Sequence, residues 1–110
     1  MKLIDLKIYP SYFRDVLSGD KTFEIRKNDR DFEVGDLLVL HEYDPDSEAY
    51  TGETLAVTVK YVFSDEKYVL PGYVVLGITK CDDNTQYICN VRNKYLFGGV
   101  QNERVQQEAP

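Results

Sequence analysis

Three residues of types that bind anions or move protons stand close together early in the chain: Lys21, Glu24 and Arg26. Arginine can make paired hydrogen bonds to a phosphate or to a base edge, and lysine adds a point charge. A carboxylate can accept a hydrogen bond from an exocyclic amine or act as a general base. We therefore interpret the group as an anion or nucleobase site. The alternative is a surface Glu–Arg ion pair, which contributes at most about 1 kcal/mol.

The residues that surround this group predict how the fold positions it. Gly19 ends a predicted helix, because glycine adopts the left-handed conformation without steric cost. Residues 22–26 then alternate polar and apolar side chains, as a half-buried strand does. Thr22, Glu24 and Arg26 would share one face of that strand, and we expect this face to be the floor of a binding cleft.

Two further features extend the candidate site. Arg30 lies on the polar loop that follows the strand, where a solvated turn is the alternative. The predicted ligand-binding residues are therefore Lys21, Thr22, Glu24, Arg26 and Arg30. Exposed aromatic side chains beside cations stack nucleic acid bases, at roughly 1–3 kcal/mol each. Among the aromatic residues, Tyr9, Tyr12 and Tyr43 are expected to reach the cleft, whereas Phe23, Tyr61 and Phe63 are assigned to the core.

Hydrophobic patterns place these residues in a small fold of mixed α+β class, mainly β. One helix is predicted at 11–18 and strands at 3–8, 21–27, 37–43, 53–63 and 73–79. Residues 44–52 are predicted as a loop, 85–91 as one more strand, and the polar residues after 96 as a loose tail. Five to six short strands with one early helix indicate a small β-barrel.

Composition limits the possible partners. The 110 residues fit one domain, and the net charge of −6 argues against general attraction to nucleic acid or to an anionic membrane. Residues 31–53 hold eight acidic residues and no lysine or arginine, so the local basic group suits a small anionic ligand. No apolar run approaches the roughly 20 residues of a membrane span, and we expect a cytoplasmic protein. Cys81 and Cys89 match no zinc pattern and are expected to be reduced thiols; no metal or cofactor is predicted.

Residues 19–26, Gly-Asp-Lys-Thr-Phe-Glu-Ile-Arg, resemble the signature of ASCH domains, a branch of the PUA-like superfamily. The longer runs 6–36 and 72–78 resemble a small stand-alone ASCH-like family of unknown function found in phages and bacteria. This resemblance implies a PUA-like β-barrel domain over 1–80, with a cleft at the helix–strand junction and RNA or a nucleotide as partner. Residues 81–110 would form a C-terminal extension.

The resemblance also leaves three functions open. The first is an RNA- or nucleotide-binding module. The second is a hydrolase acting on a modified nucleoside or on single-stranded RNA, because some ASCH relatives are amidohydrolases that use a lysine and a threonine of this motif. Lys21 matches that lysine, Thr22 matches a second threonine, and Glu24 stands where the nucleophilic threonine would be. In that hypothesis Lys21 and Glu24 are catalytic, as electrostatic stabiliser and general base. The third is a phage protein that binds a host protein through the acidic residues 31–53.

Overall fold

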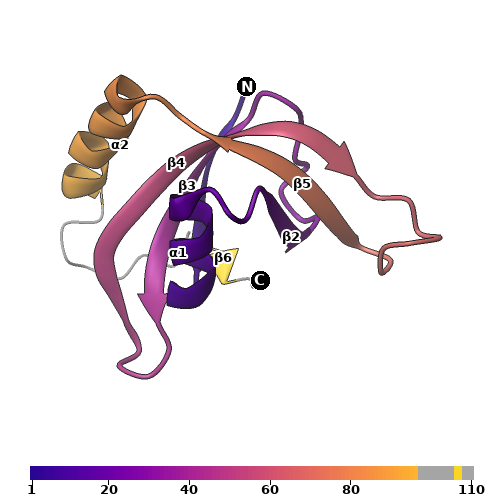
Figure 1. Cartoon of the computed structure of the whole chain (residues 1–110), viewed down its shortest axis with the longest axis horizontal. Coiled ribbons are helices and arrows are strands. Elements are labelled where there is room, and N and C mark those ends of the chain that lie inside the picture. Colours follow the sequence, from indigo (N-terminus) through magenta and orange to yellow (C-terminus); the bar gives the residue numbers. More distant parts are fainter. Residues whose placement is uncertain (97–105, 108–110) are drawn as a thin grey trace.

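A curled β-sheet forms the centre of the protein in a computed structural model that describes residues 1–96 and 106–107 (Figure 1). In chain order the elements are β1 (Leu3–Ile8), α1 (Pro10–Ser18), β2 (Phe23–Lys27), β3 (Leu37–Asp44), β4 (Ala49–Phe63), β5 (Tyr73–Lys80), α2 (Asp83–Leu96) and β6 (Gln106–Gln107). The predicted mixed α+β class is confirmed, as are the early helix and the five predicted strands.

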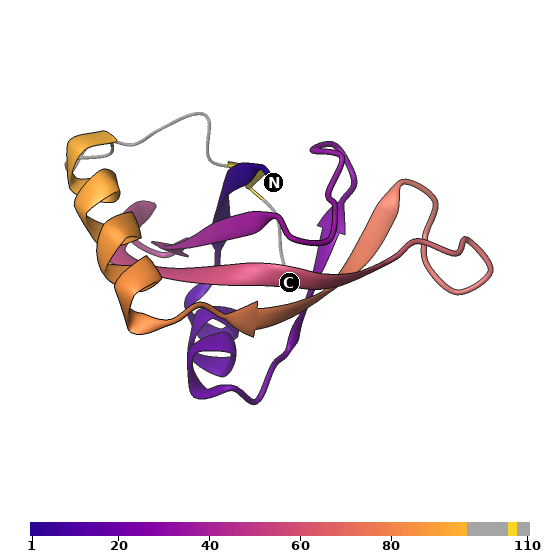
Figure 2. The ribbon, with the colours of Figure 1, turned by 90° about the horizontal axis from the view of Figure 1, so that it is seen from above.

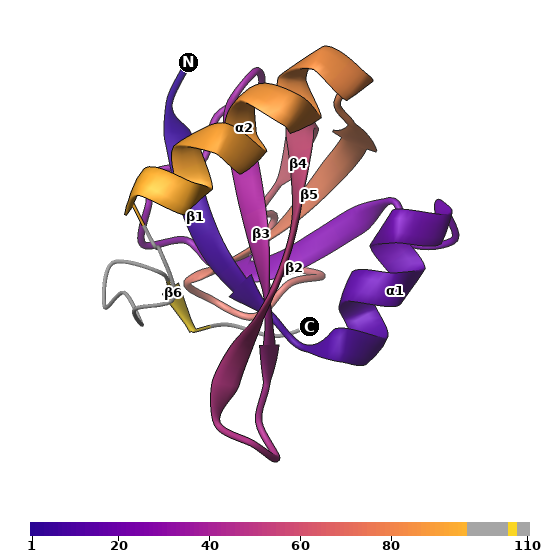
Figure 3. The ribbon, with the colours of Figure 1, turned by 90° about the vertical axis from the view of Figure 1, so that its left-hand side faces the viewer.

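The order of the strands in the sheet is β2-β5-β4-β3-β1-β6. β1 is parallel to both β3 and β6, and the other neighbours are antiparallel. The register shifts after His41 in β3 and after Val59 in β4, and such bulges bend a strand and increase its twist. The sheet curls into a half-barrel, as the view along it shows (Figure 3), which is compatible with a small barrel-like fold.

The two helices cover opposite faces of this sheet. Leu38 of β3 packs in the main hydrophobic core with Phe13 and Val16 of α1. Its neighbour Val39 packs in a second, smaller cluster with Cys89 of α2. Because successive side chains of a strand point to opposite faces, α1 and α2 lie on different sides of β3, which Figure 3 also shows.

The ends of α1 and the turn after it determine where Lys21 lies. Pro10 occupies the first turn, where its missing N–H costs nothing, and Gly19 caps the last turn with a φ of +90°. The backbone N–H of Gly19 donates to the carbonyl of Val16 at 3.1 Å, and that of Lys21 donates to the carbonyl of Asp15 at 2.9 Å. Lys21 is therefore held beside the last turn of α1. From there the chain turns away from the helix and runs into β2, as Figure 2 shows.

One side chain links the two sides of the half-barrel. β2 is an edge strand, and three strands separate it from β1 within the sheet. Nη1 of Arg26 in β2 nevertheless donates a hydrogen bond to the carbonyl oxygen of Lys7 in β1, at 2.9 Å. The curl of the sheet has brought these two strands close enough for a single guanidinium to connect them.

The strand predicted over 85–91 is wrong, because these residues belong to α2. Their β-branched and aromatic side chains favour strands when taken alone. Asp82 favours a helix over a strand at these residues. Its carboxylate accepts the N–H of Thr85 at 2.8 Å, and its carbonyl accepts the N–H of Gln86 at 3.0 Å. These are the bonds of a helix N-cap, and they turn Gln86 and Cys89 toward the sheet.

Two loop predictions also need correction. The loop predicted over 44–52 is only a short turn, since β3 runs to Asp44 and β4 begins at Ala49. The rings of Tyr43 and Tyr50 lie 5.1 Å apart and extend this hairpin. The predicted tail lies outside the described residues except at Gln106–Gln107, which form β6 and pair with Leu6 and Lys7 of β1.

The assignment of Phe23 and Tyr61 to the core is wrong. Phe23 is 42% exposed and Tyr61 is also exposed, whereas Phe63 is half-buried. The predicted alternation in β2 is present, but its polar face points into the half-barrel. Glu24 and Arg26 occupy the interior, so the apolar face of this strand is turned outward.

Gln86 fastens α2 to the sheet, and we expect its replacement by alanine to cost about 1–3 kcal/mol of unfolding free energy. Its Oε1 accepts the N–H of Ala56 at 2.8 Å and its Nε2 donates to the carbonyl of Ala56 at 2.7 Å. Ala56 is buried, so its N–H would lose a partner that water does not replace. Urea unfolding measures the loss, with Asn84→Ala at an exposed position of the same helix as control. Equal stability of the two variants would contradict this role.

Candidate functional site

Glu24 is a buried carboxylate held by two cations. Nζ of Lys21 lies 2.5 Å from its Oε1, and Nε and Nη2 of Arg26 donate to its Oε2 at 2.9 and 2.7 Å. Glu24 and Arg26 have no exposed surface, and Lys21 is 9% exposed. The fold thus brings three of the predicted site residues together, and we call Lys21, Glu24 and Arg26 the Lys-Glu-Arg cluster.

Within its three residues the cluster has a formal charge of +1, because Lys21 and Arg26 both pair with the one carboxylate of Glu24. Moving ions out of water costs several kcal/mol each, and close, well-aligned pairing is what offsets that cost. Arg26 is bonded to Glu24 and to the backbone of Lys7, so its interactions lie within the protein. Lys21 alone in the cluster contacts solvent, and the surplus charge therefore makes its ammonium the point at which an anion would be attracted.

Aromatic rings border the Lys21 ammonium on two sides. Its Nζ lies 5.2 Å from the ring centroid of Phe23 and 5.6 Å from that of Tyr12, both within the range of cation–π attraction. Tyr12 is half-buried and Phe23 is partly exposed. Tyr12 was expected near the cleft, whereas Tyr43 instead stacks under the ammonium of Lys7, 3.9 Å from the ring centroid.

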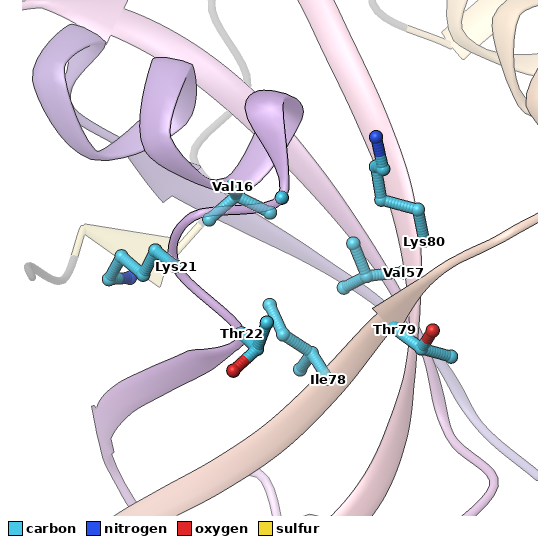
Figure 4. Close-up of a pocket in the computed structure, with 8 residues that line it drawn as sticks. Val16, Lys21, Thr22, Val57, Ile78, Thr79 and Lys80 are labelled. Carbon is cyan, nitrogen blue, oxygen red and sulfur yellow. The ribbon is translucent and has the colours of Figure 1, made fainter.

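A small pocket of about 110 Å³ lies next to the cluster, between the C-terminal end of α1 and β5. It is lined by Val16, Gly19, Lys21, Thr22, Val57, Ile78, Thr79 and Lys80. The Lys21 side chain extends away from the other lining residues (Figure 4), and Nζ of Lys80 donates to the carbonyl of Leu17 at 2.7 Å. Pockets that enclose whole small molecules measure roughly 300–1,000 Å³. This pocket is too small for a nucleotide, and the charged end of Lys21 is not inside it.

Comparison with known protein families gives a family but no activity. The family described as "Domain of unknown function (DUF3850)" matches residues 4–78, which is more than half of the chain. The chain belongs to the DUF3850 family. An Escherichia phage P2 protein, described as "Uncharacterized 12.9 kDa protein in GpA 3'region", is 48% identical over 42 residues, 38% of each chain. The match therefore spans little more than a third of that phage protein.

The DUF3850 match contains the whole Lys-Glu-Arg cluster and both of its flanking rings, whereas α2 lies outside it. The two remaining predicted site residues are Thr22 and Arg30. Thr22 is exposed, precedes β2 and accepts the N–H of Ile78 with its carbonyl at 2.9 Å. Arg30 is half-buried in the connection between β2 and β3. Because Glu24 and Arg26 face the interior, they do not form an open cleft floor with Thr22.

The Lys-Glu-Arg cluster is better arranged for binding than for proton transfer. A general base must come within hydrogen-bond reach of the proton that it takes from the substrate. Glu24 has no exposed surface, and its two oxygens already accept three hydrogen bonds from Lys21 and Arg26. The ammonium of Lys21 is the group in the cluster that a ligand from solvent reaches first.

A second polar group, partly buried, lies on the α2 side of the sheet. Asp5 of β1 accepts from Nη1 and Nη2 of Arg92 in α2 at 3.0 and 2.6 Å, and Nε2 of His41 in β3 lies 2.8 Å from its Oδ1. Asp5 and Arg92 are 87 residues apart, and no local pattern connects them. This group anchors α2 on β1 and β3.

Asp5 should make the stability of the protein depend on pH. Partial burial of Asp5 opposes its ionisation, but hydrogen bonds from His41 and Arg92 outweigh this effect and lower its pKa from 3.8 to about 2. Between these values the unfolded chain binds more protons than the folded one. The stabilisation, about 2 kcal/mol, is therefore present above about pH 4 and is lost as the pH falls through 2.

Urea unfolding between pH 7 and pH 2 tests this prediction. Asp5→Asn should be less stable than the wild type at pH 7 and should lose less stability on acidification. Asp20→Asn, at an exposed position, is the matched control and should follow the wild-type profile. A profile of Asp5→Asn parallel to the wild type would assign the acid sensitivity to other groups. Asp36 is one such group, because hydrogen bonds from Lys2 and Glu33 outweigh its burial and lower its pKa.

Two further findings concern metals and membranes. In residues 1–96 and 106–107, no three His, Cys, Asp or Glu side chains are grouped as metal ligands would be, and Cys81 and Cys89 are free thiols. No helix in this part of the chain combines the length and the hydropathy needed to cross a membrane.

Proposed function

We propose that this protein binds a nucleotide, either free or at the end of a single-stranded RNA, at Lys21. One observation carries the proposal: the Lys21 ammonium belongs to a buried cluster with a surplus positive charge and is bordered by the rings of Phe23 and Tyr12. A phosphate is attracted by the charge, and a base can stack on an aromatic face. A ligand that has both an anionic group and a flat ring uses both features.

Glu24 and Arg26 act in this proposal as positioning residues and do not contact the ligand. Glu24 holds the Lys21 ammonium through Oε1 and the Arg26 guanidinium through Oε2. Arg26 in turn is tied to the backbone of Lys7 on the other side of the half-barrel. The ammonium is therefore held in place before a ligand arrives, which reduces the entropy lost on binding.

The distribution of charge supports a short ligand. The chain carries a net charge of −6, and residues 31–53 contain no lysine or arginine. A long polyanion would meet this acidic surface and be repelled, whereas a nucleotide or an RNA end requires only the local charge at Lys21. Binding should therefore be specific to the site and sensitive to salt.

The resemblance of residues 19–26 to the ASCH signature supports the same proposal. We infer a PUA-like domain over residues 1–80, with its ligand at the junction between the early helix and the following strand. Lys21 and Phe23 belong to this junction, and Tyr12 comes from the helix. The half-barrel and its early helix are compatible with such a domain.

NMR titration tests the proposal with four probes: a nucleoside, a nucleoside monophosphate, inorganic phosphate and a short single-stranded RNA. The expected result is a set of shifts centred on Tyr12, Lys21 and Phe23 with the monophosphate and the RNA, with weaker shifts from the nucleoside or phosphate alone. If inorganic phosphate alone causes shifts as large as those caused by the monophosphate, the site binds anions without recognising the base. If all four probes leave these residues unperturbed, the proposal fails.

Phe23→Ala tests the stacking contribution separately. Loss of a base–aromatic stack costs about 1–3 kcal/mol, so the affinity for the monophosphate should fall roughly 5- to 150-fold. Tyr68→Ala, which removes an exposed ring from the connection between β4 and β5, is the matched control and should bind as the wild type does. If Phe23→Ala and Tyr68→Ala bind the monophosphate with equal affinity, Phe23 is not part of the binding site.

A further inference from the structure

The outward face of α2 carries a continuous apolar stripe. Tyr87, Ile88, Val91 and Tyr95 are between 38% and 87% exposed, although their residue types favour burial. Their spacings of three and four residues place them on one side of the helix. Gln86 and Cys89 occupy the other side and hold α2 on the sheet. The stripe is therefore a feature of the surface that the packing of α2 on its own domain does not explain.

We propose that this stripe, residues Tyr87, Ile88, Val91 and Tyr95, is the interface between two copies of the chain, packed as an antiparallel helix pair. The stripe reads almost the same in both directions along the helix: Val91 is central, Tyr87 and Ile88 lie about one turn before it, and Tyr95 lies one turn after it. A two-fold axis at Val91 therefore places Tyr95 of each copy against Tyr87 and Ile88 of the other. Such a self-complementary surface is what a two-fold interface requires.

Charges along the edge of the stripe favour the same occupant and the same direction. Asp83 near the start of α2 and Lys94 near its end are eleven residues apart, close to three full turns, so they lie on the same flank. In an antiparallel pair the flank that carries Asp83 and Lys94 faces the same flank of the other copy. The start of one helix then lies beside the end of the other. With the axis at Val91, Asp83 of one copy lies about 7.5 Å along the helix from the level of Lys94 of the other, close enough for electrostatic attraction, and this attraction occurs twice. In a parallel pair each flank would meet the opposite flank of the other copy, and Asp83 and Lys94 would not approach each other.

The size of the interface sets the expected strength of the dimer. Fourteen helical residues form a seam only about 21 Å long, which is at the small end of protein interfaces. The net charge of −6 on each copy also opposes association and is screened by salt. We therefore expect a dimer with a Kd on the order of micromolar, favoured by moderate salt.

Sedimentation equilibrium on the full chain, from about 1 to 500 µM protein, tests this interface. The wild type should pass from monomer to dimer over this range. Val91→Glu places a charge at the centre of the seam and should weaken dimerisation at least tenfold. Leu70→Glu is the matched control, because Leu70 is an exposed apolar residue on the connection between β4 and β5 and should leave the dimer unchanged. A wild type that stays monomeric, or equal dimerisation of both variants, would overturn the proposal.

A charge exchange tests the direction of the helices. Asp83→Lys and Lys94→Asp should each weaken the dimer severalfold, and the chain carrying both changes should recover most of the wild-type affinity. Far-UV circular dichroism establishes that each variant keeps α2. Failure of the double variant to recover, with α2 intact, would overturn the antiparallel arrangement. Dimerisation of the wild type that Val91→Glu does not affect would place the interface elsewhere.

Discussion

Replacing Glu24 with alanine is expected to destabilise the protein by about 3–5 kcal/mol, because it leaves two buried cations without their carboxylate. Glu24 accepts three hydrogen bonds from Lys21 and Arg26, and neither it nor Arg26 has exposed surface. Arg26 would keep its bond to the carbonyl of Lys7, but its guanidinium would lose the two hydrogen bonds that it donates to Glu24 inside the half-barrel. A domain of this size has a total stability of roughly 5–15 kcal/mol, so the loss is large.

Urea unfolding of Glu24→Ala measures this effect, and Glu66→Ala on the exposed connection before β5 is the matched control. The triple variant Lys21→Met, Glu24→Leu, Arg26→Met should recover most of the lost stability, because buried ion groups are often replaceable by apolar residues of similar volume. A Glu24→Ala variant as stable as its control would mean that water or another group takes over the role of the carboxylate.

Lys21→Met is expected to weaken nucleotide binding by about 10- to 100-fold, because it removes the surplus charge and keeps the aliphatic part of the side chain. The fold should survive this change, since Glu24 and Arg26 remain paired and neutral as a unit. Isothermal titration with a nucleoside monophosphate, at low and at moderate salt, measures the loss. The dependence of affinity on salt should decrease together with the affinity itself.

Lys27→Met is the matched control for this second prediction. Lys27 is an exposed lysine at the far end of β2, so both variants remove one lysine charge from the same short stretch of chain. If the two changes weaken binding equally, the attraction comes from general charge and the site is not at Lys21. The triple variant adds an independent check, because it should be folded and yet should not bind the nucleotide.

Several elements of the fold could be predicted from local sequence alone. Pro10 and Gly19 mark the limits of α1, because one tolerates the first turn of a helix and the other adopts the left-handed cap. Alternating apolar residues mark β1 and β4, whose buried side chains include Leu6 and Val57. Lys21, Glu24 and Arg26 were found as a group because they are adjacent in the chain and local spacing suffices to bring them together.

The tertiary structure decided which face of β2 is inside. A two-residue period is the same whichever face is buried, and burial of apolar side chains is the usual outcome. In this protein the charged residues face inward, because Glu24 is neutralised by Lys21 and Arg26 and because the curl of the sheet brings the carbonyl of Lys7 within reach of Arg26.

The C-terminal part depended on contacts that are distant in sequence. The residues of α2 favour a strand when considered singly, but the N-cap at Asp82 and the bonds of Gln86 to Ala56 and of Arg92 to Asp5 hold a helix against the sheet. The sequence by itself determined the early helix, the strands and the members of the Lys-Glu-Arg cluster, because these follow from neighbouring residues. Only the tertiary structure decided the orientation of that cluster and the position of α2, because both depend on partners that folding brings from 19 to 87 residues away.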